Sequence, residues 1–143
     1  MTWNEYKRYL MQSYDQFIAE HQIGDDQIDK GVRYEKITDV DCVRLGYGQH
    51  LFFKAGQLRL IYISGGELAT RIWEEFERSP HADAPRQVVR SRAGKTAKQI
   101  VVAEQGITAS IQRDEIDFLE IYPPLSPTDY LANIYREPKP FIR

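Results

Sequence analysis

The residues Gly94-Lys95-Thr96 are the first candidate for chemistry in this sequence, because they end the phosphate-binding loop of many ATP and GTP enzymes. That loop has an earlier glycine, five residues before Gly94, where this chain has Val89. It also requires a helix after the threonine, whose backbone N–H groups face the phosphates. Here the run after Thr96 is rich in β-branched residues and predicts a strand. The sequence therefore predicts a turn between two strands and no nucleotide cofactor.

The same region is strongly basic. Between positions 86 and 98 there are five basic residues and no acidic residue. Arg90 and Arg92 are two positions apart, so their side chains would leave the same face of a strand. Such a patch suits a phosphate, a nucleic acid or an acidic protein surface. The five residues are Arg86, Arg90, Arg92, Lys95 and Lys98.

A second interpretation of this patch is structural. The stretch 114–120 carries four acidic residues. If the two stretches form paired strands, their charges offset each other across the sheet, and each pair contributes only about 0.2–1 kcal/mol. We expect this pairing. The candidate binding residues on either interpretation are Arg90, Arg92, Lys95, Lys98 and Glu120.

Glu120 stands out because it shares an otherwise apolar strand face with Ile116, Phe118 and Tyr122. A carboxylate in such a place is either paired, for example with one of the arginines, or has a raised pKa. A raised pKa would suit general acid or base catalysis, but the spacing identifies no second acidic partner. We predict a structural ion pair at the edge of the sheet.

The remaining candidates indicate neither a catalytic site nor a metal site. The three histidines, at 21, 50 and 81, are too far apart to show a metal-ligand spacing. Cys42 is the single cysteine, and its apolar surroundings predict a small buried side chain rather than a nucleophile. The aspartates at 25, 26 and 29 lack the glycine and the final glutamate of a calcium loop.

The first half of the chain predicts a helix followed by strands. Apolar residues at three- and four-residue steps predict one helix over 2–22, with Thr2 and Glu5 as a capping box. The polar stretch 25–30 predicts a loop, and turn residues divide 31–64 into four strands.

The second half predicts a helix over 67–79, four strands between 86 and 122, and a last helix that begins at Ser126 and Pro127 and ends before Pro138. The alternation in 107–112 predicts a strand whose polar side chains face water. Because strands and helices do not alternate one by one, we predict an α+β fold with an antiparallel or mixed sheet and three packed helices.

The composition suits a single domain over 1–143, with an extended tail at 138–143. A hydrophobic fraction of 42% and a charged fraction of 28% argue against disorder. The formal net charge of −2 argues against a general nucleic-acid binder. No apolar stretch is long enough for a secretion signal or a membrane helix, so we expect a soluble cytoplasmic protein.

The segment 31–64 has a recognisable layout of Tyr47-Gly48, an aromatic strand at 51–53, the turn Ala55-Gly56 and a strand at 58–61. This layout resembles that of small bacterial α+β proteins that are encoded beside toxins and act as immunity proteins. The resemblance implies a protein that neutralises a toxin by binding it. It assigns no binding residue.

These observations favour a non-enzymatic protein-binding module, of the immunity or antitoxin type, whose partner is a toxin. Charged and tyrosine-rich strands and loops are typical of protein interfaces. The alternative is a small enzyme or phosphate-ligand binder that uses the basic segment 86–98. We expect no membrane partner, and nucleic acid is the least favoured ligand.

Overall fold

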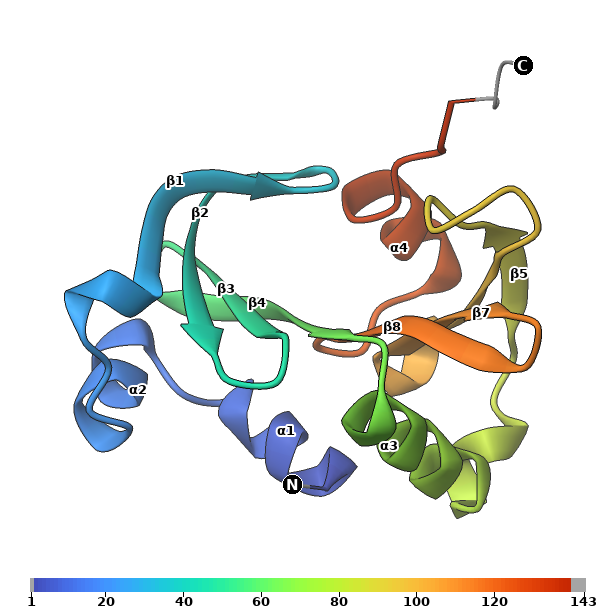
Figure 1. Ribbon diagram of the computed structural model, residues 1–143, viewed down its shortest axis with the longest axis horizontal. Coiled ribbons are helices and arrows are strands. Elements are labelled where there is room, and N and C mark those ends of the chain that lie inside the picture. The colour runs from blue at the N-terminus through green and yellow to red at the C-terminus, as the bar shows by residue number, and fades with distance from the viewer. Residues whose placement is uncertain (1, 140–143) are drawn as a thin grey trace.

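The computed structural model describes residues 2–139, over which the chain forms four α-helices and one sheet of eight strands (Figure 1). All strand pairs are antiparallel, which confirms the predicted α+β class and shows that the two groups of strands share one sheet. The helices are α1 (Trp3–Tyr9), α2 (Tyr14–Glu20), α3 (Glu67–Glu77) and α4 (Pro127–Asn133). The strands are β1 (Ile28–Tyr34), β2 (Ile37–Leu45), β3 (Gln49–Lys54), β4 (Gln57–Ser64), β5 (Gln87–Arg90), β6 (Lys98–Val102), β7 (Ile107–Gln112) and β8 (Glu115–Ile121).

The sheet consists of two four-stranded meanders joined at their last strands. Its order is β1-β2-β3-β4-β8-β7-β6-β5, so β4 and β8 lie at the centre and β1 and β5 at the edges. In the central pair, Tyr62 lies opposite Glu120. Residues far apart in the sequence therefore meet in the middle of the sheet.

Each face of the sheet has its own apolar core. The larger core lies under α1, α2 and α3, which contribute Trp3, Phe17 and Trp73 among others. The smaller core lies on the opposite face, where α4 contributes Tyr130. Because alternate residues of a strand point to opposite faces, the central strands β4 and β8 supply buried side chains to both sides.

The predicted N-terminal helix over 2–22 is in fact two helices. The predicted capping box of Thr2 and Glu5 begins α1, but a second capping box of Ser13 and Gln16 begins α2. The break is held by the turn between β3 and β4, because the Tyr14 N–H donates to the Gly56 carbonyl oxygen over 2.9 Å. The apolar spacing alone predicted a continuous helix because it runs through both segments.

The structure differs from the sequence-based predictions at three other places. Strand β1 begins at Ile28, inside the stretch predicted to be a loop. Helix α4 has Ser126 as its N-cap and Pro127 at its start, as predicted, but ends at Asn133. Of the predicted tail 138–143, only Pro138 and Lys139 are described, neither of them in a helix or strand, and the rest lies outside the described residues.

Strand β7 differs from its prediction in the surroundings of its polar side chains. Thr108 and Ser110 are fully buried, although the alternation predicted that they face water. The Thr108 hydroxyl lies 2.8 Å from that of Tyr122, and the Ser110 hydroxyl lies 2.6 Å from that of Ser91. This face of the sheet is therefore covered, with its polar groups hydrogen-bonded to one another.

Candidate binding site

The turn around Gly94 joins β5 to β6, as the sequence predicted. The Ser91 N–H donates to the Ala97 carbonyl oxygen, and the Ala97 N–H donates to the Gly94 carbonyl oxygen, both over 3.2 Å. A strand follows Thr96, so this turn does not place a helix N-terminus at a phosphate.

Glu120 lies on the α4 face at the centre of the sheet and is fully buried. Its two carboxyl oxygens accept hydrogen bonds from the hydroxyl groups of Tyr34, at the end of β1, and Tyr130, in α4. The Arg92 guanidinium donates to the Tyr34 hydroxyl over 2.9 Å, and the Gln99 side-chain amide donates to the Tyr130 hydroxyl over 2.6 Å. We call these five residues the Glu120 cluster.

The outer members of the cluster fix the direction of its hydrogen bonds. Arg92 and the amide nitrogen of Gln99 can only donate, so both tyrosine hydroxyls accept from them and donate to Glu120. Burial raises the pKa of the Tyr34 and Tyr130 hydroxyls, so they stay protonated and keep their donor role. The cluster is thus a fixed chain of donors that ends on one buried carboxyl group.

Burial is also the largest influence on Glu120 and raises the pKa of its carboxyl group. The hydrogen bonds from Tyr130 and Tyr34 and the charge of Arg92 act in the opposite direction. The carboxyl group does not reach the surface, and both its oxygens are occupied. Through these hydrogen bonds the Glu120 carboxyl group connects β8 to β1 and to α4.

Arg92 connects this cluster to the surface. Its guanidinium lies over the rings of Phe118, at 4.2 Å from the centroid, and Tyr34, at 5.1 Å, and 3.3 Å from the Glu35 carboxylate. About a third of the side chain is exposed, at 33%. A guanidinium that stacks on aromatic rings is held in place, and its exposed part can contact a ligand.

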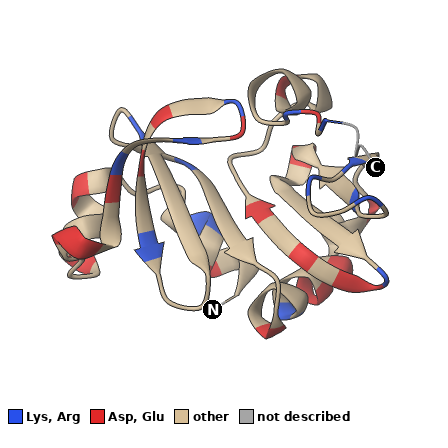
Figure 2. Ribbon diagram, turned by 45° about the horizontal axis from the view of Figure 1, so that its top comes forward, with Lys and Arg blue, Asp and Glu red and all other residues tan. Residues whose placement is uncertain are grey.

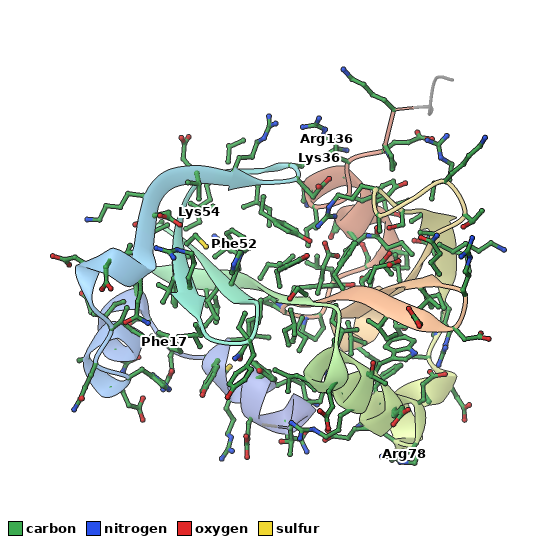
Figure 3. The ribbon with its side chains drawn as sticks, viewed as in Figure 1. Phe17, Lys36, Phe52, Lys54, Arg78 and Arg136 are labelled. Atoms are coloured by element: carbon green, nitrogen blue, oxygen red, sulfur yellow. The ribbon has the colours of Figure 1, made fainter. Side chains whose placement is uncertain are left out.

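The outward side of Arg92 lines a pocket of about 430 Å³ between the turn after β1 and the segment after α4. Both parts carry basic residues and lie side by side (Figures 1 and 2). Arg136, in the segment after α4, lies at this end of the molecule (Figure 3). We call it the arginine pocket; it is lined by Arg33, Glu35, Arg92, Arg136, Glu137, Pro138 and Lys139.

The structure brings together only part of the predicted site. Arg92 and Glu120 belong to one cluster, and Arg90 lies close by, since its guanidinium donates to the Pro138 carbonyl oxygen over 2.7 Å. Lys95 and Lys98 are exposed and do not line the arginine pocket. These two lysines are therefore separate from the rest of the site.

Two predictions about charge pairing are wrong. Strand β8 pairs with β4 and β7, so the acidic stretch does not lie beside β5 and β6. Glu120 lies at the centre of the sheet rather than at its edge, and tyrosines rather than arginines contact its oxygens. The prediction that Glu120 shares a strand face with Phe118 and Tyr122 is confirmed. It is wrong for Ile116, because a bulge in the β7–β8 pairing turns this side chain toward the larger core.

The sequence did not predict Tyr34, Gln99 and Tyr130 of the Glu120 cluster, nor any residue of the arginine pocket other than Arg92. A polar residue on an otherwise apolar strand face indicates a buried hydrogen-bonding group, and this pattern singled out Glu120. Gln99 shows the same pattern in β6, where its side chain is buried, so it could have been found in the same way. The two tyrosines carry no such signal, because a tyrosine in a core is ordinary.

The other polar residues considered in the sequence form no reactive cluster. Within residues 2–139, no three histidine, cysteine, aspartate or glutamate side chains are grouped so as to hold a metal ion. Cys42 is buried in the smaller core, as predicted, and burial raises its pKa to about 11. None of the helices in this range has the length and apolar character needed to cross a membrane.

The raised pKa of Glu120 predicts a specific pH dependence of stability. The folded state binds a proton on this group more tightly than the unfolded chain does, so the group's contribution to the free energy of unfolding falls as the pH rises above about 4.5. Glu120→Gln removes this contribution. We expect the free energy of unfolding of the variant, relative to wild type, to increase with pH from 4.5 upward, as measured by urea unfolding at several pH values. A relative stability that decreases with pH would contradict a raised pKa.

Comparison with known protein families, curated protein sequences and solved structures gives no match for this chain.

Proposed function

We propose that this protein is a non-enzymatic binding protein that recognises an acidic surface of another protein through the α4 face of its sheet. The observation that carries this proposal is the local charge. The arginine pocket and a second pocket on the same face are lined by seven basic residues and two acidic ones, although the whole chain has a formal net charge of −2. A basic surface on an acidic protein favours a partner of opposite charge.

The chemistry of the exposed groups supports binding rather than catalysis. Three arginines line the arginine pocket, and arginines stay protonated and make paired hydrogen bonds with carboxylates. Glu120 is fully buried beneath Tyr34 and Arg92, so its carboxyl group cannot contact a ligand in the pocket. The resemblance of residues 31–64 to immunity proteins would make the partner a toxin.

The test is affinity capture of the host's proteins with wild type and two charge-reversed variants. Arg33→Glu with Arg136→Glu alters the pocket; both side chains are exposed and make no hydrogen bond or ion pair with described residues, so the fold should persist. Lys95→Glu with Lys98→Glu is the matched control, with the same charge change outside the pocket. We expect a stoichiometric protein partner that binds the pocket variant at least tenfold more weakly, which is about 1.4 kcal/mol, and the control as wild type.

Recovery of no stoichiometric partner under several growth conditions would count against the proposal. Equal weakening by both variants would show that the net charge matters and that the arginine pocket does not.

A phosphate-bearing small molecule is a second candidate, favoured by one observation. Arg33, Arg92, Arg136 and Lys139 converge on a single pocket, and phosphate oxygens accept several such donors at once. A thermal-shift screen with inorganic phosphate, nucleotides and sugar phosphates tests it. A true ligand at 100 times its dissociation constant should stabilise the protein by about 2.7 kcal/mol, whereas unchanged melting temperatures dismiss this candidate.

A further inference from the structure

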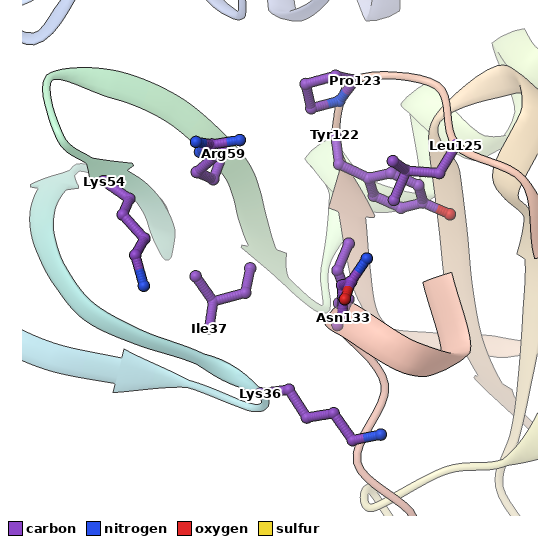
Figure 4. Close-up of a pocket in the computed structure, with 9 residues that line it drawn as sticks. Lys36, Ile37, Lys54, Arg59, Tyr122, Pro123, Leu125 and Asn133 are labelled. Carbon is purple, nitrogen blue, oxygen red and sulfur yellow. The ribbon is translucent and has the colours of Figure 1, made fainter. Parts of the chain in front are cut away.

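A second pocket, of about 310 Å³, lies on the α4 face and is separate from the arginine pocket (Figure 4). Its walls come from the turn between β1 and β2 with the first residue of β2, from the strands β3 and β4, from the segment after β8, and from the end of α4. We call it the lysine pocket; it is lined by Lys36, Ile37, Lys54, Arg59, Tyr122, Pro123, Leu125, Asn133 and Ile134.

The floor of the lysine pocket is apolar. Tyr122 and Ile134 are buried members of the smaller core, and Ile37 and Leu125 pack against that core while remaining partly exposed. The Tyr122 hydroxyl is bonded on its inner side, to Thr108, so the ring presents carbon to its neighbours. The size and lining are those of pockets that hold small ligands.

The rim of the lysine pocket carries three basic side chains whose charges are not neutralised. The Lys36 ammonium donates to the Leu131 carbonyl oxygen over 2.9 Å, and the Lys54 ammonium donates to the Thr38 carbonyl oxygen over 2.8 Å. These bonds hold the two ammonium groups in place without cancelling their charge. No carboxylate within residues 2–139 forms an ion pair with either lysine or with Arg59, and none lines the pocket.

From this arrangement we propose that the lysine pocket binds a small amphipathic anion, with a carboxylate at one end and a short acyl chain at the other. Lys54 and Arg59 suit the carboxylate, and the floor of Ile37, Tyr122, Leu125 and Ile134 suits the chain. The Lys36 ammonium points away from Lys54 and Arg59, toward α4 (Figure 4), and adds only its positive charge. A charged ligand without an apolar part would leave the floor uncovered, and an uncharged one would leave the basic rim without a partner. This pocket shares its three basic residues with the surface proposed above to bind a protein partner, but its ligand is a separate small molecule and is tested without that partner.

The experiment titrates octanoate into the protein, followed by calorimetry and by backbone amide NMR shifts, with acetate and 1-octanol as the two half-ligands. We expect one saturable site, with shifts at Ile37, Leu125 and Ile134, and at least tenfold weaker binding of acetate and of 1-octanol. Absence of saturable octanoate binding would overturn the proposal. Equal binding of 1-octanol would also overturn it, because the basic rim would then play no part.

Variants locate the site. Lys54→Gln with Arg59→Gln should weaken octanoate binding at least tenfold, and the matched control Lys98→Gln with Arg113→Gln, both exposed and outside the pocket, should bind as wild type. Arg59→Gln alone should weaken binding at least threefold; it breaks no hydrogen bond among the described residues, so a loss of binding cannot come from a lost fold. Unchanged binding in these pocket variants, or equal loss in the control, would overturn the assignment.

Discussion

Tyr130→Phe is expected to lower the free energy of unfolding by about 3–5 kcal/mol, measured by urea unfolding at pH 7. The lost hydroxyl is one of the two donors to the buried carboxyl group of Glu120. It is also the acceptor for the Gln99 side-chain amide, which is 2% exposed and has no water to replace it. One oxygen atom thus satisfies two buried polar groups, and its removal leaves both incomplete.

Tyr135→Phe is the matched control, because it makes the same chemical change further along the chain, just after α4. The Tyr135 hydroxyl donates to the Arg90 carbonyl oxygen over 2.8 Å at an exposed position, where water can take its place. Its loss should cost less than about 1 kcal/mol. Equal costs for the two variants would mean that Glu120 does not depend on Tyr130.

A double-mutant cycle assigns the effect to this pair. If Tyr130 acts on Glu120, then Tyr130→Phe should cost less in the background of Glu120→Gln, with a coupling energy of at least about 1 kcal/mol. Additive costs would instead place the whole effect on Gln99.

The sequence predicted those parts of the site that depend on local structure. The turn at Gly94 and the N-cap at Ser126 follow from a few neighbouring residues, and the face of Glu120 follows from the period of a strand. The partners of Glu120 could not be predicted in this way. Tyr34 is 86 positions away, and it reaches Glu120 only because the two meanders join through β4 and β8.

Some wrong predictions came from patterns that fit two arrangements. The alternation in β7 is the same whether Thr108 and Ser110 face water or a buried set of hydrogen bonds, and only the position of the covering segments decides between them. The break between α1 and α2 did have a local signal, the capping pair Ser13 and Gln16, but the apolar spacing around it favoured a continuous helix.

The arginine and lysine pockets had no signal in the sequence because no single segment contains them. The basic segment 86–98 supplies only Arg92 to the arginine pocket, and the other basic residues come from the end of β1 and the segment after α4. A count of charges along the chain therefore overstated the role of Lys95 and Lys98.

The second large effect is expected at Gly106, where we predict that Gly106→Ala lowers the free energy of unfolding by about 3–5 kcal/mol. Gly106 has φ of 67°, and a Cβ atom there would lie 2.1 Å from the carbonyl oxygen of Tyr122. That oxygen belongs to the backbone, so the contact can be relieved only by moving the end of β8. The Gly106 carbonyl also accepts from the Tyr122 N–H over 3.0 Å, so the two segments cannot separate without breaking this bond.

Gly31→Ala is the control that separates the cost of the Cβ contact with Tyr122 from the cost of the positive φ angle. Gly31 has φ of 64°, almost the same as Gly106, but nothing lies within 4 Å of the position of its Cβ. This control should cost only the strain of a left-handed residue, about 1–2 kcal/mol. The difference between the two variants in urea unfolding then measures the contact with Tyr122. If the costs are equal, the approach of the two backbones is looser than described. If Gly106→Ala is the more costly, it should also weaken octanoate binding, because Tyr122 forms part of the floor of the lysine pocket.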